Sequence, residues 1–148
     1  MAKICILDVP DRPGIAATLF QALADEAINV DMIIQSTTRG NNRNDISFTV
    51  GRDDLDRALE VAERINRELG AGGIIHGSDI AKVSIVGAGM ITNPGVAATM
   101  FRALANEGIN IEMISTSEIK VSCVIRAEDA QKAVMALHRE FGLDKGAV

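Results

Sequence analysis

Aromatic residues and clustered positive charge are both scarce in this sequence. Its 148 residues include no tryptophan, no tyrosine and four phenylalanines, the net charge is −5, and no basic run exceeds two residues. Proteins that bind single-stranded nucleic acid stack bases on aromatic rings, and nucleic acids and anionic membranes attract clustered lysine and arginine. The composition therefore argues against a nucleic acid or a membrane surface as the partner.

Cysteine is also scarce. Cys5 and Cys123 lie inside apolar runs, where a cysteine usually behaves as a small buried hydrophobe. Two such residues form no disulfide framework, which fits a reducing cytoplasm. No apolar run approaches the roughly 18 residues of a membrane span, and the N-terminus has no signal-peptide pattern. We expect a cytoplasmic protein.

Motifs for metal, cofactor or catalytic chemistry are missing as well. His76 and His138 are isolated, so metal-ligand spacing is absent. The stretch Val86-Gly87-Ala88-Gly89-Met90 is similar to part of a dinucleotide fingerprint, but the last glycine of that motif is replaced by Thr92. No nucleophilic triad, paired-carboxylate site or phosphate loop can be assembled. We expect a non-catalytic chain without metal or cofactor.

An internal repeat organises what is present. A shift of 81 positions aligns Pro13–Met32 with Pro94–Met113 without a gap, and 13 of the 20 paired positions are identical. Chance does not plausibly produce such a block, and a repeat of this kind indicates duplicated structural units. We expect two modules, at residues 1–80 and 81–148.

Both modules have the pattern of a small α+β fold. In each, a β-branched strand, a Pro-Gly turn and an amphipathic helix precede two strands and a second helix. The first module adds a final strand, which completes the ferredoxin-like βαββαβ order with antiparallel strands and helices on one face. The expected strands are 4–9, 30–37, 45–50 and 74–76 in the first module and 83–86, 111–116 and 120–125 in the second; the expected helical faces span 16–27, 55–69, 97–108 and 130–141.

Three local features complete the expected fold. Asp53 is a plausible N-cap of the second helix. Residues 39–44 read as a solvated polar loop. After Phe141 only Gly142–Val148 remains, a poor strand. The second module is therefore expected to lack one edge strand, and a segment absent from this sequence or another chain would cover that edge.

The Pro-Gly turns are the strongest candidate binding features. Pro preorganises a first helical turn, and Gly allows another group to approach the backbone. The N–H groups of Gly14, Ile15 and Ala16, like those of 95–97, would lie without intrahelical partners at the positive end of the helix dipole, where a carboxylate fits. The alternative is an ordinary helix start capped by Asp11 or Asn93. Repetition of the turn in both modules favours a ligand.

Polar residues at the far end of each first helix could receive an ammonium group. Ile28–Met32 and Ile109–Met113 each pair an amide with a carboxylate in an otherwise apolar strand entry. These side chains could equally cap a turn and point to water. Among the polar residues expected on the second strands, Gln35 and Ser117 are the strongest candidates for ligand contact.

The turn, the helix after it and the strand 28–33 resemble the ACT regulatory module, and Ile114-Ser115-Thr116-Ser117-Glu118-Ile119 is similar to the C-terminal ACT pair of the aspartate kinase family. The resemblance covers essentially the whole chain. It implies feedback control by threonine, lysine or both, in a homodimer that acts on an aspartate kinase catalytic subunit or domain. The effector would bind between the first module of one chain and the second module of its partner.

The same resemblance implies the residues of two sites. One site uses Asp11, Pro13, Gly14, Ile15, Ala16 and Gln35 with Asn110 and Ile111 of the partner chain, and the other uses Val96 and Ala97 with Asn29, Val30 and Asp31, plus Ser117 and Glu118. Family members can carry a hydroxyl side chain in place of Ala97, and a lead segment in the family supplies a strand to the second module. The kinase portion is absent from this sequence.

Two rival hypotheses remain open. The chain could regulate another amino-acid biosynthetic enzyme through the same kind of module. It could also be a ferredoxin-like enzyme that uses Asp31, Glu112 or Glu118 for catalysis. A purified chain that turns over a substrate without a partner would support the second rival.

Overall fold

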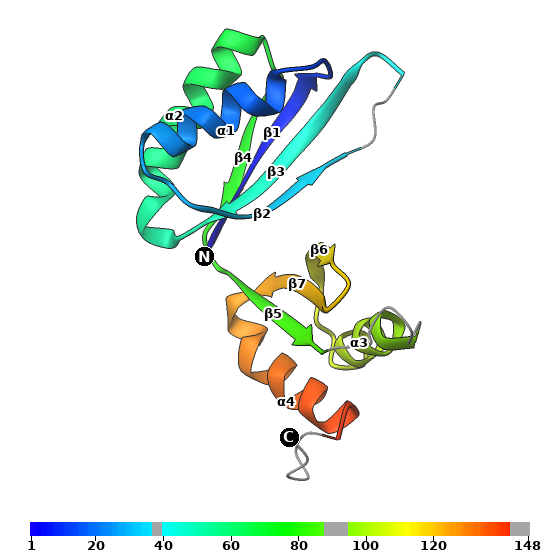
Figure 1. Ribbon diagram of the computed structural model, residues 1–148. Coiled ribbons are helices and arrows are strands. Elements are labelled where there is room, and N and C mark those ends of the chain that lie inside the picture. The colour runs from blue at the N-terminus through cyan, green and yellow to red at the C-terminus, as the bar shows by residue number, and fades with distance from the viewer. Residues whose placement is uncertain (37–39, 88–94, 143–148) are drawn as a thin grey trace. The chain divides into compact units, whose positions relative to one another are not determined.

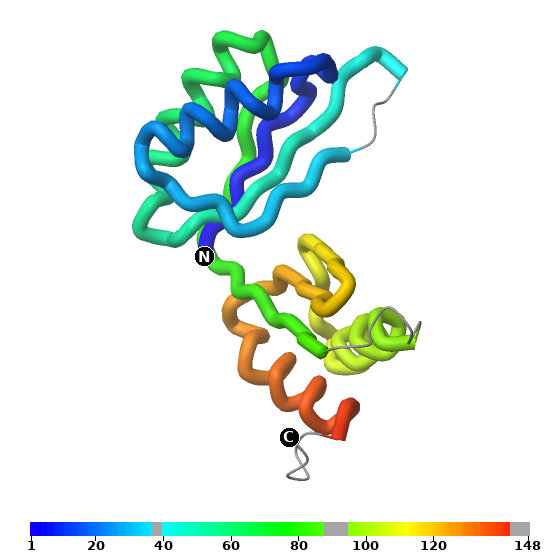
Figure 2. The backbone as a smooth tube through the Cα atoms, viewed as in Figure 1, coloured from blue at the N-terminus to red at the C-terminus, as the bar shows by residue number. Residues whose placement is uncertain are grey.

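The computed structural model describes residues 1–36, 40–87 and 95–142. The chain divides into two compact units, unit 1 at Met1–Ser78 and unit 2 at Asp79–Val148 (Figure 1). Figure 2 traces the backbone through both units.

Unit 1 is a four-stranded antiparallel sheet with two helices on one face (Figure 1). The strand order β2-β3-β1-β4 is that of a ferredoxin-like βαββαβ fold, which confirms the predicted architecture. Its elements are β1 (Ala2–Pro10), α1 (Ile15–Asp25), β2 (Val30–Gln35), β3 (Arg43–Val50), a 3₁₀ turn (Arg52–Asp54), α2 (Leu55–Leu69) and β4 (Gly73–Gly77).

The core of unit 1 lies between the sheet and its helices. Alternation along the strands places one apolar row toward the helices, and the helices contribute apolar residues three and four positions apart. The predicted helix face is only partly right, because Leu19 and Leu23 are buried whereas Ala16 and Ala27 are exposed. Ala27 follows the end of α1 in a left-handed conformation. Members of this core include Ile4, Ile6, Ile15, Leu19, Leu23, Ile46, Phe48, Val50, Ala58 and Ile65.

The predicted N-cap of α2 is wrong. A 3₁₀ turn over Arg52–Asp54 precedes the helix, so Asp54 rather than Asp53 occupies the cap position, and it makes no side-chain cap hydrogen bond. The Asp54 N–H donates to the Gly51 carbonyl, and its carboxylate receives the Arg57 guanidinium at 2.6 Å. The 3₁₀ turn, and not the predicted Asp53 side chain, therefore starts the helix.

Unit 2 is a three-stranded antiparallel sheet in the order β5-β7-β6, with helices α3 and α4. Its elements are β5 (Ile80–Val86), α3 (Gly95–Asn106), β6 (Ile111–Thr116), β7 (Lys120–Arg126), a 3₁₀ turn (Ala127–Asp129) and α4 (Ala130–Glu140). Within residues 79–87 and 95–142, no strand pairs with the outer side of β5, as expected for a module without one edge strand. Every described strand pair is antiparallel, unlike the parallel order of a dinucleotide-binding fold.

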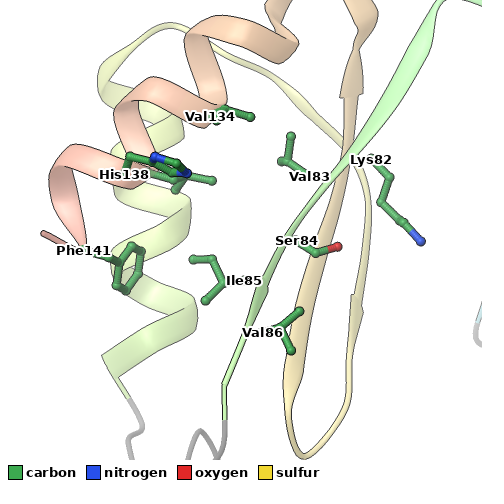
Figure 3. Close-up of a pocket in the computed structure, with 9 residues that line it drawn as sticks. Lys82, Val83, Ser84, Ile85, Val86, Val134, His138 and Phe141 are labelled. Carbon is green, nitrogen blue, oxygen red and sulfur yellow. The ribbon is translucent and has the colours of Figure 1, made fainter. Parts of the chain in front are cut away.

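The open side of β5 corresponds to a paired strand in unit 1. Ile33 and Ile114 are equivalent in the repeat. Ile33 pairs with Phe48, which pairs with Ile4. In the same way, Ile114 pairs with Cys123, which pairs with Val83. Residues 82–86 therefore take the place of residues 3–7, the stretch of β1 that pairs with β4. A groove of about 520 Å³ lies there between β5 and α4 (Figure 3). It is lined mainly by apolar side chains: Val83, Ile85, Val86, Val134, Leu137 and Phe141.

The two equivalent strands are expected to differ in backbone hydrogen exchange. β1 has a neighbour on each side, whereas β5 pairs with β7 alone among the described strands. In 82–86, amides that point to the open side should exchange at least about tenfold faster than their counterparts in 3–7. Amide exchange followed by NMR measures this, with the central strands β3 and β7 as internal controls. Equal protection of β5 and β1 would show that another segment covers the edge.

Candidate functional site

The turn before α1 ends in a glycine in a left-handed conformation. Gly14 is the N-cap residue, with φ 93° and ψ −13°, and the cap makes no side-chain hydrogen bond. The helix begins at Ile15, so Pro13 lies before the cap and not within the first helical turn. A positive φ is easily adopted only by glycine. The backbone of Gly14 therefore sets the direction in which this helix N-terminus points.

The first residues of α1 divide between the core and the surface. The Ile15 side chain is buried at 6% exposure, so only its backbone is available to a ligand. Its N–H has no partner within the helix, as expected, and donates a long hydrogen bond of 3.4 Å to the Arg12 carbonyl outside it. Ala16 is exposed. The Gly14 carbonyl accepts hydrogen bonds from both the N–H and the Oγ1 of Thr18, at 2.9 Å each, which fixes the helix start.

Gln35 lies at the same end of the sheet as the turn. β1 and β2 both run antiparallel to β3, so their carboxyl ends meet at the start of β3. The Asp11 N–H donates to the Asn42 carbonyl at 2.7 Å, which ties the turn to the entry of that strand. Gln35 pairs with Ile46, a core residue, so its exposed side chain lies on the helix-bearing face. Unit 1 thus gathers residues 11–16 and Gln35 at one end.

The other predicted residues of unit 1 lie at the opposite end of α1. The helix has 11 residues, which corresponds to about 16 Å. Asn29 and Asp31 are exposed, and Val30 packs against the core. The register of β2 against β3 shifts between Val30 and Ile33, so the strand bulges at Asp31 and Met32. A single unit therefore does not bring its own turn and its own Asn-Asp segment to one small ligand.

Unit 2 repeats this separation. Val96 and Ala97 lie in the first turn of α3 and are half-buried, whereas Asn110 is exposed beyond the far end of that helix. Ile111 pairs with Ile125, and a second register shift follows before Met113. Asn93 and Pro94, also predicted here, lie outside the described residues. The turn end and the asparagine end are again about one helix length apart.

Ser117 and Glu118 lie in the tight hairpin turn that the predicted strands 111–116 and 120–125 leave between them, although Ser117 was also expected among the strand residues. β6 ends at Thr116 and β7 begins at Lys120, which leaves a three-residue connection. The Ser117 N–H donates to the Lys120 carbonyl at 2.7 Å, and its Oγ accepts a long bond of 3.4 Å from the Ile119 N–H. Both side chains are exposed. The hairpin lies at the end of the sheet where α3 begins (Figure 3).

The carboxylates of the rival enzyme hypothesis are exposed. Asp31 lies in unit 1, while Glu112 and Glu118 stand at opposite ends of β6, and all three are exposed. Burial raises the pKa of the Cys123 thiol to about 11, which keeps it protonated and unreactive near neutral pH. Among the described residues, no group of three potential metal ligands occurs, and no helix is long and apolar enough to cross a membrane.

Asn44 is a candidate that sequence reasoning missed. Residues 39–44 were expected to form a solvated loop, but β3 begins at Arg43 and Asn44 is buried at 2% exposure. The available signal was the alternation Asn44, Ile46, Phe48, which continues the core row by one polar residue. Its position beside the turn end of unit 1 makes it relevant to the site.

Both units match a known family. Residues 3–67 and 83–141 each match the ACT domain. The chain belongs to the ACT domain family. Its match to aspartokinase from Thermus thermophilus is 49% identical over 145 residues, which cover 97% of this chain and 36% of that protein. The chain spans about a third of the length of the curated relatives it matches.

Solved structures show which proteins contain a similar tandem pair of ACT units. The regulatory subunit of aspartate kinase from Thermus thermophilus is 48% identical, with a TM-score of 0.86 and coverage of 95% of this chain and 92% of that chain. A chain in the crystal structure of aspartokinase alpha and beta subunits gives 47% identity and the same TM-score over the same coverage. These similarities confirm the predicted resemblance: the tandem ACT units form a regulatory region of the aspartate kinase family.

Proposed function

We propose that this chain senses threonine, lysine or both and transmits their binding to an aspartate kinase catalytic subunit or domain. The observation that supports the proposal is the repeated arrangement of the two ACT units, each with a helix N-terminus at one end and an asparagine beside a strand bulge at the other. The helix N-terminus suits the effector carboxylate, and amide and carboxylate oxygens suit its ammonium.

The proposed site combines two chains. Within one unit the two halves lie about 16 Å apart, too far for one free amino acid to contact both. β2 and β6 are edge strands, and each exposes an isoleucine at the equivalent position, Ile33 at 54% and Ile114 at 43%. Exposed apolar side chains on edge strands favour association. A homodimer that joins unit 1 of one chain to unit 2 of its partner would bring each turn to the other unit's asparagine.

Regulation follows if the dimer can adopt two arrangements that bind the effector with different affinity. Effector binding shifts such an equilibrium only by its differential affinity for the two states, and the same coupling changes the activity of the attached kinase. The alpha and beta subunits in the related crystal structure support a separate catalytic partner. A regulatory role in another amino-acid biosynthetic enzyme is the alternative, and a pull-down that recovers that enzyme instead of a kinase would favour it.

Calorimetric titration with threonine and with lysine tests the proposal. We expect saturable binding of at least one of them to a dimeric chain, with the dimer checked by sedimentation. Gln35→Ala and Asn110→Ala should each weaken the same site by about tenfold, because each removes one hydrogen bond to the ligand. Asn29→Ala, the matched change at the equivalent position of unit 1, should weaken only the other site. A folded dimer that gives no heat with either amino acid would refute the proposal.

A further inference from the structure

Asn44 continues the core-facing row of β3 at the end of the sheet where α1 begins. Ile46, Phe48 and Val50 occupy the alternate positions of this strand, and all three belong to the core under the helices. Asn44 pairs with Val9, another core residue, and Val9 leads directly into the turn at 11–14. Residues paired across antiparallel strands point to the same face. The Asn44 side chain therefore points to the helix-bearing face beside the α1 N-terminus.

The amide oxygen of Asn44 is buried without a hydrogen-bond partner among the described residues. A buried acceptor that lacks a donor destabilises the folded state, and an apolar side chain at this position would avoid the penalty. Buried polar groups are normally satisfied, so an exception calls for a physical explanation. A donor supplied by a ligand is one such explanation, and the position of Asn44 beside the predicted effector turn favours it.

Gln35 places a second polar group on the same face. It pairs with Ile46, the next residue of the row, so Gln35 and Asn44 are diagonal neighbours on adjacent strands. Such neighbours lie about 7 to 8 Å apart, close enough to contact one small ligand. The helix N-terminus, the Gln35 amide and the buried Asn44 oxygen thus converge from three elements on one end of unit 1.

Unit 2 has no counterpart of this acceptor. Phe48 and Ile46 correspond to Cys123 and Val121, so the position two residues earlier is Ile119. Ile119 lies in the hairpin and is 55% exposed. An apolar side chain accepts no hydrogen bond, so the additional acceptor belongs to the site of unit 1 alone. The two sites of the tandem pair therefore differ in the ligand groups that they can recognise.

We propose that Asn44 selects the side chain of the effector, accepting a hydrogen bond from a hydroxyl group of an amino acid bound at the turn of unit 1. The inference rests on the proposed function and deepens it. A single neutral oxygen satisfies a neutral hydroxyl but does not compensate for the burial of an ammonium group. The site of unit 1 should accordingly prefer threonine to lysine, and to valine, which has the shape of threonine without its hydroxyl.

Access to the oxygen requires movement of a neighbouring segment. The oxygen is shielded from solvent, whereas residues 11–14 of the adjacent turn are all exposed. A shift of this turn would admit the hydroxyl and reorient the N–H groups of the helix start at the same time. Recognition of the side chain and binding of the carboxylate would then occur together.

Asn44→Val and Asn44→Thr form a matched pair, because valine and threonine have the same shape and only threonine retains an oxygen acceptor. We expect threonine to bind the unit 1 site of the valine variant about tenfold more weakly than that of the threonine variant, while valine as a ligand binds both variants equally. Calorimetry on the full chain, in an Asn29→Ala background that weakens the other site, measures both ligands, and circular dichroism confirms that each variant is folded.

Other outcomes separate the two proposals. If threonine binds the unchanged chain and both variants with equal affinity, the role of Asn44 is refuted while the proposed function stands. A loss of lysine affinity larger than the loss of threonine affinity would overturn the assignment to a hydroxyl. If neither amino acid binds the unchanged chain, the proposed function fails and this inference fails with it.

Discussion

Phe48→Ala is expected to lower the free energy of unfolding of unit 1 by about 3 to 5 kcal/mol. Phe48 is fully buried in the helix-facing row of β3 and is the largest fully buried side chain among the described residues. Its ring packs edge to face against Phe20, with centroids 5.7 Å apart and planes at 81°. Truncation leaves a cavity between the sheet and α1, and the proposed binding of threonine or lysine at unit 1 should be lost with it.

Urea denaturation measures this loss, and the repeat provides a matched control. Phe20 and Phe101 are equivalent residues on α1 and α3, and both are half-buried. Phe20 contacts Phe48, but the residue of unit 2 that is equivalent to Phe48 is Cys123, so Phe101 has no such aromatic partner in the part of unit 2 that the structure describes. Phe20→Ala should therefore destabilise the chain by about 0.5 to 1.5 kcal/mol more than Phe101→Ala, the contribution of the aromatic pair. A loss below about 1 kcal/mol for Phe48→Ala would contradict this description of the core.

The fold was predictable because two independent signals agree in the sequence. The strand and helix periodicities define each module, and the 81-residue repeat shows that the same order of strands and helices must fit both modules. Leu19 and Leu23 are buried where the helical spacing places them, and Leu104 repeats the pattern in unit 2. The three strands that the structure describes in unit 2 agree with the weak strand pattern after Phe141.

The start of β3 could not be predicted because distant contacts determine it. The Arg43 guanidinium donates to the Asp8 carbonyl at 2.8 Å and to the Gly70 carbonyl at 2.7 Å, and it lies 3.1 Å from the Asp8 carboxylate. These partners are 35 and 27 residues away in the sequence. Arg43 and Asn44, which the local sequence predicts as loop residues, therefore belong to β3, and Asn44 is buried there.

The proposed site combines residues that the sequence singles out with a geometry that the sequence does not convey. The repeat and the family resemblance identify the turn residues and Gln35, and the structure brings them to one end of unit 1. The separation of each turn from its own asparagine depends on the length and direction of α1, which a list of residues does not convey.

Gly14→Ala is expected to weaken effector binding at unit 1 by about 100-fold. A Cβ at Gly14 meets no atom within 4 Å, so the substitution acts through the backbone conformation alone. Alanine disfavours φ 93° by about 1 to 2 kcal/mol, and relaxation of the turn redirects the N–H groups at the start of α1. Loss of two charge-assisted hydrogen bonds at about 1.5 kcal/mol each corresponds to a factor of about 100 in affinity.

Gly70→Ala separates this effect on binding from general destabilisation. Gly70 also has a positive φ, of 64°, with no atom within 4 Å of an added Cβ, but it caps α2 and lies outside the α1 turn. Its carbonyl, which accepts a hydrogen bond from Arg43, is retained in an alanine variant. Both variants should lower the stability of unit 1 by about 1 to 2 kcal/mol in urea, whereas calorimetry should show weakened threonine binding only for Gly14→Ala. Equal binding losses in the two variants would mean that the turn acts only through the stability of the unit. A binding loss confined to Gly14→Ala would show that the left-handed glycine orients the helix N-terminus toward the effector carboxylate.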